Sequence, residues 1–110
     1  MAHEKGVKIA LGTDTIIDTM TPFGAFSIEE LRTLVRLGMS PLEAINAATQ
    51  IGSEVLGLED IIGTVEAGKQ ADLLILSDDP SNDIEILCNV ENIEYVLQSG
   101  KPVVDHGQVL

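Results

Sequence analysis

The hydrophobic pattern of this chain changes its period near residue 58, and this change limits the folds that the chain can adopt. Before that point, apolar residues recur at the spacing of amphipathic helices. Beyond it, they form the continuous or alternating runs that are typical of strands. We therefore predict an α/β chain made of two unequal parts, residues 1–57 and residues 58–110.

The first part carries the start and stop signals of two helices. Ser27 is the predicted N-cap of the first helix, because Glu30 stands three residues later and completes a capping box. Gly38 is the predicted terminating residue. A second capping box runs from Ser40 to Glu43 and has a proline at the first helical position.

Strand signals lie on both sides of these helices. Residues 7–12 are predicted to be a short strand, and residues 15–26 a loop. Residues 71–76 form an apolar run that predicts a strand buried on both faces. Residues 93–98 alternate as a half-exposed strand would, and a hairpin turn at 99–100 follows. The first strand has nothing to pair with, and exposed strand edges invite association, so a homo-oligomer is expected.

The chain is strongly acidic, which limits its partners. It has 18 acidic residues against 6 Lys and Arg, a formal net charge of −12. We expect no nucleic acid and no membrane as partner, because phosphates and anionic lipids are bound mainly through Lys and Arg. The predicted helices 28–38 and 41–51 imitate a helix-turn-helix, which the same argument excludes. No apolar run approaches the roughly 18 residues of a membrane span, and a cytoplasmic location is expected.

Two features that suggest chemistry have simpler structural interpretations. Cys88, the single cysteine, lies in a mainly apolar stretch and is expected to be a small buried hydrophobe rather than a nucleophile. Residues 63–69 imitate the spacing of a phosphate-binding loop. Gln70 follows in place of Ser or Thr, however, and no helical pattern continues, so this interpretation is rejected.

Several short motifs, in order along nearly the whole chain, resemble those of the amidohydrolase superfamily. Residues 6–14, which end in Gly-Thr-Asp, are similar to the last barrel strand of these enzymes. Residues 38–45 resemble the start of the helix that follows it, and residues 62–73 and 100–103 resemble later motifs of the family. Within the family, the motifs resemble those of the imidazolonepropionase-like and prolidase-like branches. Ala67 stands where proline is usual, which weakens assignment to one branch.

This resemblance implies a (β/α)8 barrel with a small β-sandwich. Residues 1–57 would then be the last strand and helices of the barrel, and residues 58–110 the C-terminal strands of the sandwich. A complete barrel takes about 250 residues, so this chain of 110 residues is expected to be a C-terminal fragment. The implied activity of the complete parent is metal-dependent hydrolysis of a carbon–nitrogen bond in a small amide, cyclic amide or dipeptide.

Asp14 is the site residue that the resemblance assigns. The corresponding aspartate of the family lies beside the metal, can ligate it, and accepts a proton from the metal-bound water. Spacing alone favours a turn residue, since Asp is common in turns whatever its chemistry. A catalytic zinc, the expected divalent metal, needs about three protein ligands. The only histidines, His3 and His106, are expected to be exposed near the termini, so the isolated chain is expected to hold no metal.

Two functions from different classes stay open. The first is an amidohydrolase fragment that is inactive alone and whose parent acts on a small-molecule amide or dipeptide. The alternative is a non-catalytic acidic interaction or oligomerisation module. A monomer that unfolds cooperatively and binds no metal would favour the module.

Overall fold

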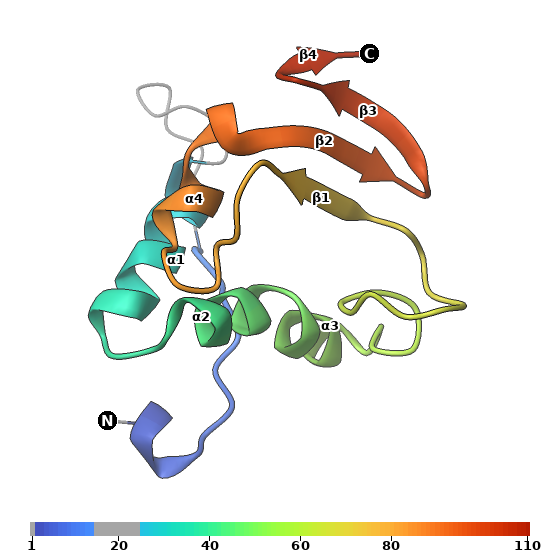
Figure 1. Cartoon of the computed structure of the whole chain (residues 1–110). Coiled ribbons are helices and arrows are strands. Elements are labelled where there is room, and N and C mark those ends of the chain that lie inside the picture. Colours follow the sequence, from blue (N-terminus) through green and yellow to red (C-terminus); the bar gives the residue numbers. More distant parts are fainter. Residues whose placement is uncertain (1, 15–24) are drawn as a thin grey trace.

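The computed structural model describes residues 2–14 and 25–110 (Figure 1). The helical elements are η1 (His3–Lys5), α1 (Ala25–Arg36), α2 (Pro41–Ala48), α3 (Gln50–Leu56), α4 (Glu85–Cys88) and η2 (Val90–Asn92). The strands are β1 (Leu73–Leu76), β2 (Ile93–Gln98), β3 (Lys101–Asp105) and β4 (Gln108–Val109). The α/β class is therefore confirmed. Within the described ranges, no helix is long and apolar enough to cross a bilayer.

The predicted capping box at the start of α2 is confirmed. The Glu43 backbone N–H donates to Ser40 Oγ at 3.3 Å, and the Ser40 backbone N–H donates to Glu43 Oε2 at 2.8 Å. The corresponding prediction for α1 is wrong, because this helix begins at Ala25 and Ser27 lies inside its first turn. The predicted loop 15–26 lies outside the described residues up to position 24, and its last two residues are helical.

The end of α1 follows the Schellman pattern, as the glycine at position 38 predicts. Gly38 has a φ of +106°, a conformation that favours glycine. Its N–H donates to the Val35 carbonyl at 3.0 Å, and the Met39 N–H donates to the Leu34 carbonyl at 3.2 Å. These two bonds satisfy carbonyls at the helix end that have no partner in the helix itself.

The helix predicted over residues 41–51 is divided into α2 and α3 at Thr49. The backbone of Thr49 leaves the helical region, with φ −117° and ψ −86°. Its hydroxyl donates to the Ile45 carbonyl at 2.8 Å, a local bond that often bends helices. The helical pattern then continues to Leu56, where Gly57 ends it in a left-handed conformation.

The four strands form one antiparallel meander in the order β1-β2-β3-β4. The hairpin predicted at residues 99–100 is confirmed. Ser99 and Gly100 have φ values of +50° and +77°, and His106 and Gly107 have +43° and +80°. Positive φ at both central residues is the mark of the turns that match the twist of a two-stranded ribbon.

Two strand predictions are wrong. Residues 7–12 are irregular, because no described strand pairs with them; the Leu11 N–H donates instead to the Ala47 carbonyl at 3.0 Å. The apolar run at 71–76 contains β1, but β1 is not buried on both faces. As an edge strand it leaves Leu74 50% and Ile75 43% exposed.

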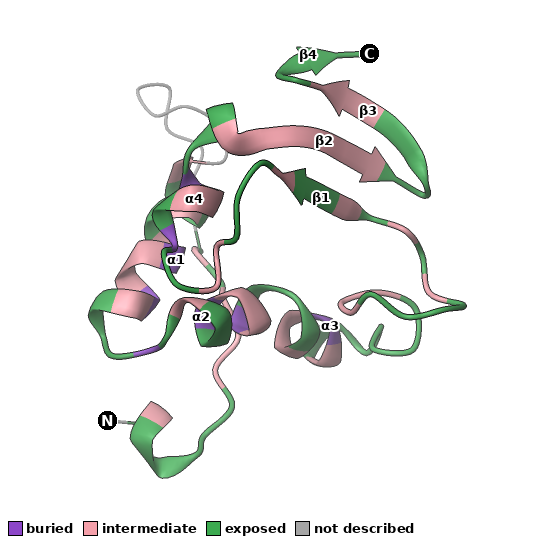
Figure 2. Cartoon of the chain, in the orientation of Figure 1, coloured by how far each residue is buried: buried purple, intermediate pink, exposed green. Residues whose placement is uncertain are grey.

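The core lies among α1, α2 and α4, where the buried residues gather (Figure 2). Its members are Leu31, Leu34, Met39, Ala44, Ala47, Ile84 and Cys88. The prediction of a buried Cys88 is confirmed, and burial raises the pKa of its thiol. Arg32 connects α1 to α4 through two hydrogen bonds of 2.8 Å to the Glu85 carboxylate.

The division of the chain into a barrel part, residues 1–57, and a sandwich part, residues 58–110, stays a prediction.

Candidate functional site

Asp14 belongs to an irregular segment, residues 7–14, that packs against the helical core. Ile9 and Leu11 contact the core, and the backbone bond from Leu11 to Ala47 fixes the path of the segment. Asp14 itself is exposed and adopts a φ of +45°. Among non-glycine residues, Asp and Asn tolerate this left-handed conformation best. The carboxylate is therefore exposed to solvent, in a backbone conformation that suits both interpretations of this residue.

The described residues do not provide a metal site around Asp14. Over residues 2–14 and 25–110, no group of three or more His, Cys, Asp or Glu side chains could hold a metal ion. A catalytic zinc takes about three protein ligands. This part of the chain alone therefore does not fit the metal that the family resemblance implies.

Each of the two histidines has a carboxylate partner of its own. His3 Nε2 lies 3.5 Å from Glu43 Oε2, and the His3 side chain is 24% exposed, so the prediction of an exposed, frayed residue is wrong. His106 is exposed as predicted, at the tip of the β3–β4 turn. Its Nδ1 lies 2.5 Å from Asp105 Oδ1, and its ring meets Tyr95 edge-to-face, with centroids 5.2 Å apart.

His106 predicts a pH-dependent stability of the sheet. The hydrogen bond that the imidazole Nδ1–H donates to the Asp105 carboxylate, aided by the charges of Asp105 and Glu94, raises the imidazole pKa above its ordinary value of 6.5. Protonation therefore favours the folded chain. This stabilisation is complete below pH 6.5 and is lost as the pH rises through the folded-state pKa. We therefore expect a contribution to the thermal unfolding midpoint that decreases as the pH rises through this window.

His106→Asn is the control for this prediction, because Asn also tolerates positive φ. This variant should remove the pH-dependent contribution to the unfolding midpoint. Asp105→Asn should bring the imidazole pKa, measured by NMR, back towards its ordinary value. An imidazole whose pKa is the same with and without the Asp105 carboxylate would contradict the assignment.

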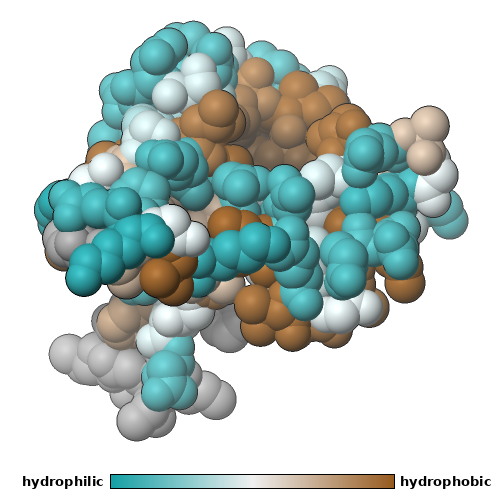
Figure 3. Space-filling model, turned by 90° about the horizontal axis from the view of Figure 1, so that it is seen from below, coloured by the Kyte–Doolittle hydropathy of each residue, from teal (hydrophilic) through white to brown (hydrophobic). Residues whose placement is uncertain are grey.

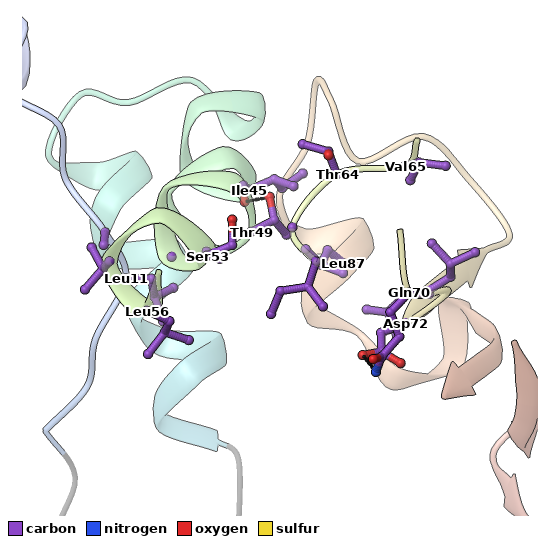
Figure 4. A pocket seen from close by; sticks show the side chains of 18 of the residues that line it. Leu11, Ile45, Thr49, Ser53, Leu56, Thr64, Val65, Gln70, Asp72 and Leu87 are labelled. Carbon is purple, nitrogen blue, oxygen red and sulfur yellow. Dashed lines mark hydrogen bonds between the residues drawn. The ribbon is translucent and has the colours of Figure 1, made fainter. Parts of the chain in front are cut away.

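A largely apolar groove of about 700 Å³ lies between the helices and β1 (Figure 4). It is bounded by α2 and α3 on one side and by the loop after α3 and strand β1 on the other. Figure 3 shows one face of the molecule, on which hydrophobic residues gather around a hollow with hydrophilic residues at its rim. The apolar lining residues are Ala10, Leu11, Ile45, Ala48, Val55, Leu56, Ile62, Val65, Leu73, Leu74, Leu76, Pro80 and Leu87.

Five polar side chains line this groove, and each has a hydrogen-bond partner within the chain. Thr49 Oγ1 donates to the Ile45 carbonyl, and Ser53 Oγ donates to the Gln50 carbonyl at 2.7 Å. Gln70 Nε2 donates to Asp72 Oδ2 at 2.7 Å, while Asp72 Oδ1 accepts from the Ser99 N–H at 2.8 Å. The groove is thus suited to apolar contact rather than to acid–base chemistry. Sequence patterns do not reveal it, since its walls come from segments far apart in the chain.

The loop after α3 is organised by Lys69, which sequence reasoning missed. Lys69 Nζ donates to the Glu59 carbonyl and to Thr64 Oγ1, each at 2.6 Å, and lies 2.9 Å from Glu66 Oε2. Hydrogen bonds from Thr64 and Lys69 lower the pKa of Glu66. Lys69 therefore stabilises the loop to which it belongs. The loop does not lead into a helix, which agrees with the rejection of a phosphate-binding site.

Comparison with known proteins connects these features to one family. The amidohydrolase family model matches residues 1–103. Ochratoxinase of Aspergillus niger is 36% identical over 101 residues, which cover 91% of this chain and 20% of that protein. Imidazolonepropionase of Geobacillus kaustophilus is 32% identical over 106 residues, 96% of this chain and 25% of that protein.

Solved structures give the same result. A Xaa-Pro dipeptidase with methionine bound in its active site matches with a TM-score of 0.78 and 37% identity, over 92% of this chain and 23% of that one. The ochratoxinase structure matches with a TM-score of 0.81 over 96% of this chain and 24% of that one. The chain thus spans about a fifth to a quarter of the length of the relatives that it matches.

Proposed function

This chain belongs to the amidohydrolase family, and we propose that it is the C-terminal segment of a metal-dependent hydrolase that cleaves a carbon–nitrogen bond. The relatives support this proposal, since they include an imidazolonepropionase and a Xaa-Pro dipeptidase. A small amide, cyclic amide or dipeptide is accordingly the proposed substrate of the complete enzyme. The resemblance of residues 6–14 to the last strand of an amidohydrolase barrel, ending at Asp14, relates this segment to the chemistry.

Asp14 is the residue through which we propose that this segment acts. Its carboxylate is exposed, on a segment whose Ile9 and Leu11 pack against the core, and can face groups contributed by the rest of an enzyme. Its proposed roles are metal ligand and proton acceptor, and zinc is the expected metal. The barrel and sandwich assignment of residues 1–57 and 58–110 is part of the same proposal, as is a cytoplasmic location.

The number of metal-ligating side chains supports the proposal that the metal site of this chain is incomplete. The described residues gather no group of three metal-ligating side chains. The segment by itself is therefore proposed to be inactive and to bind no metal tightly. Its unpaired strand edge and apolar groove support the further proposal that the isolated chain is a homo-oligomer.

Metal content provides the test. We expect the purified chain, loaded with zinc and then dialysed against metal-free buffer, to retain far less than one zinc per chain by elemental analysis. It should also leave Xaa-Pro dipeptides uncleaved. Asp14→Asn is the matched variant and should give the same residual zinc. One zinc per chain that is lost in Asp14→Asn would contradict the proposal, because copies of the chain would then complete a site around Asp14.

A further inference from the structure

The break between α2 and α3 changes the partner of a backbone carbonyl. In an uninterrupted helix, the Ala47 carbonyl would accept from the N–H four residues later, that of Ile51. The helix is interrupted at Thr49, whose φ of −117° and ψ of −86° are not helical. The Ala47 carbonyl accepts instead from the Leu11 N–H at 3.0 Å. The break therefore supplies an acceptor to the segment that carries Asp14.

Burial makes this hydrogen bond important to both partners. Ala47 is 0% exposed, so its carbonyl has little access to water. Buried carbonyls are almost always paired, because an unpaired one is costly. No described strand pairs with residues 7–12, so the bond from Leu11 gives this segment a fixed position that a sheet would otherwise supply.

The Thr49 side chain stabilises the interrupted form of the helix. The Thr49 N–H donates to the Asn46 carbonyl at 3.3 Å, a bond to the third residue back that is common at helix ends. The Thr49 hydroxyl donates to the Ile45 carbonyl at 2.8 Å (Figure 4), which in a regular helix would accept from the Thr49 N–H. Alanine at this position would lose the hydroxyl bond and has a higher helix propensity. It would therefore favour a continuous helix, in which the Ile51 N–H takes the Ala47 carbonyl.

Side-chain contacts place the start of the segment on the same two helices. His3 Nε2 lies 3.5 Å from Glu43 Oε2 of α2, and Lys8 Nζ lies 2.5 Å from Glu54 Oε2 of α3. Both pairs are partly exposed to solvent, and such pairs contribute little to stability. The backbone bond of Leu11, three residues before Asp14, is therefore the polar contact that most directly fixes the approach to this carboxylate.

We propose that the helix break at Thr49 positions the segment that carries Asp14, with Thr49 as a positioning residue that keeps the Ala47 carbonyl available to Leu11. The benefit to catalysis rests on the proposed hydrolase function of Asp14, whereas the attachment of the segment does not. Misplacing a reacting group by about 1 Å can cost about 10²-fold in rate. A contact three residues from Asp14 can therefore affect catalysis without touching the substrate.

Hydrogen exchange of the Leu11 amide in the full chain, followed by NMR, tests the attachment. Thr49→Ala should speed this exchange about tenfold or more, because the Ala47 carbonyl is then shared with the helix. Thr49→Ser retains a hydroxyl and should keep the native rate. Thr33→Ala, the same change inside α1, is the matched control and should also keep it.

The substitutions at Thr49 should preserve the fold, because this side chain is exposed, and circular dichroism will verify this. A Leu11 amide that exchanges equally fast in the native chain and in Thr49→Ala would overturn the proposal. So would equally fast exchange in Thr49→Ala and Thr49→Ser, because the hydroxyl would then have no part in it.

Activity tests the consequence for Asp14 when the chain completes a truncated Xaa-Pro dipeptidase, the similar enzyme of known structure. Thr49→Ala should lower kcat for dipeptide hydrolysis about 10- to 100-fold with little change in KM. Thr49→Ser and Thr33→Ala should keep the native kcat. An unchanged kcat in Thr49→Ala, in an enzyme that Asp14→Asn impairs, would overturn the positioning role. If Asp14→Asn is fully active, the proposed function fails instead, and the Leu11 amide alone decides whether the break holds the segment.

Discussion

Asp14→Asn will reduce dipeptide hydrolysis by roughly 10²- to 10⁴-fold when this chain completes an amidohydrolase, the range that a positioned acid–base group supplies. The experiment co-expresses the chain with the similar Xaa-Pro dipeptidase truncated where the match begins, since the match covers 23% of that enzyme. Release of free proline measures activity. The loss is expected because Asn retains the shape of Asp14 but can neither accept the proton nor offer a negative charge to a metal.

The choice of Asn separates chemistry from backbone effects. Asp14 has a φ of +45°, and Asn tolerates the left-handed region about as well as Asp. Asp60→Asn, at an exposed position in the loop after α3, makes the same chemical change away from the proposed site and should retain full activity. A complemented enzyme in which Asp14→Asn and Asp60→Asn are equally active would show that Asp14 is a turn residue.

Gly63→Ala will lower the free energy of unfolding by about 3 kcal/mol. A Cβ at this position would lie 2.4 Å from Ser53 Oγ, 2.7 Å from Ser53 Cβ and 3.0 Å from the Thr49 carbonyl oxygen. Ser53 is buried, with 3% exposure, and its Oγ is held by the Gln50 carbonyl, so it has little room to move. Overpacking of this kind costs about 1–3 kcal/mol, and the left-handed backbone adds about 1–2 kcal/mol for a residue with a Cβ.

Gly68→Ala isolates the backbone part of this loss. Gly68 has the same φ, +96°, but a Cβ there would meet nothing within 4 Å. The expected loss is about 1 kcal/mol, from conformation alone. Urea unfolding of both variants at one protein concentration gives the comparison, because association would otherwise shift the midpoints. Equal losses in the two variants would mean that α3 and the loop separate without cost, against the packing described here.

The features that could be predicted from sequence are those determined by near neighbours. The capping box at Ser40, the helix end at Gly38 and the turn at Ser99–Gly100 each depend on a few adjacent residues, and each is confirmed. One local signal failed, because α1 begins at Ala25 and not at the capping box of Ser27. The strand predictions that failed depended on distant partners. Residues 7–12 have the composition of a strand but no described strand beside them, and β1 has the composition of a buried strand but lies at an edge.

In the candidate site, too, the features that depend on distant contacts could not be predicted from the sequence. Asp14 was identified through family resemblance, since its spacing alone favours a turn. The contact between Gly63 and Ser53, and the groove that adjoins it, depend on how the loop after α3 folds back. Lys69 was assigned no role in the sequence, because its three partners are identified only once the loop is closed.

The pairing of Arg32 with Glu85 has a consequence for the order in which the chain folds. This contact spans 53 residues, whereas the β2–β3 and β3–β4 turns each join adjacent strands. Closing a long loop costs more entropy than closing a short one, and contacts of low sequence separation form sooner. The meander can therefore assemble early, before the helical core closes. We therefore expect docking of α4 on α1 to be a later step than formation of the β2–β3 and β3–β4 hairpins.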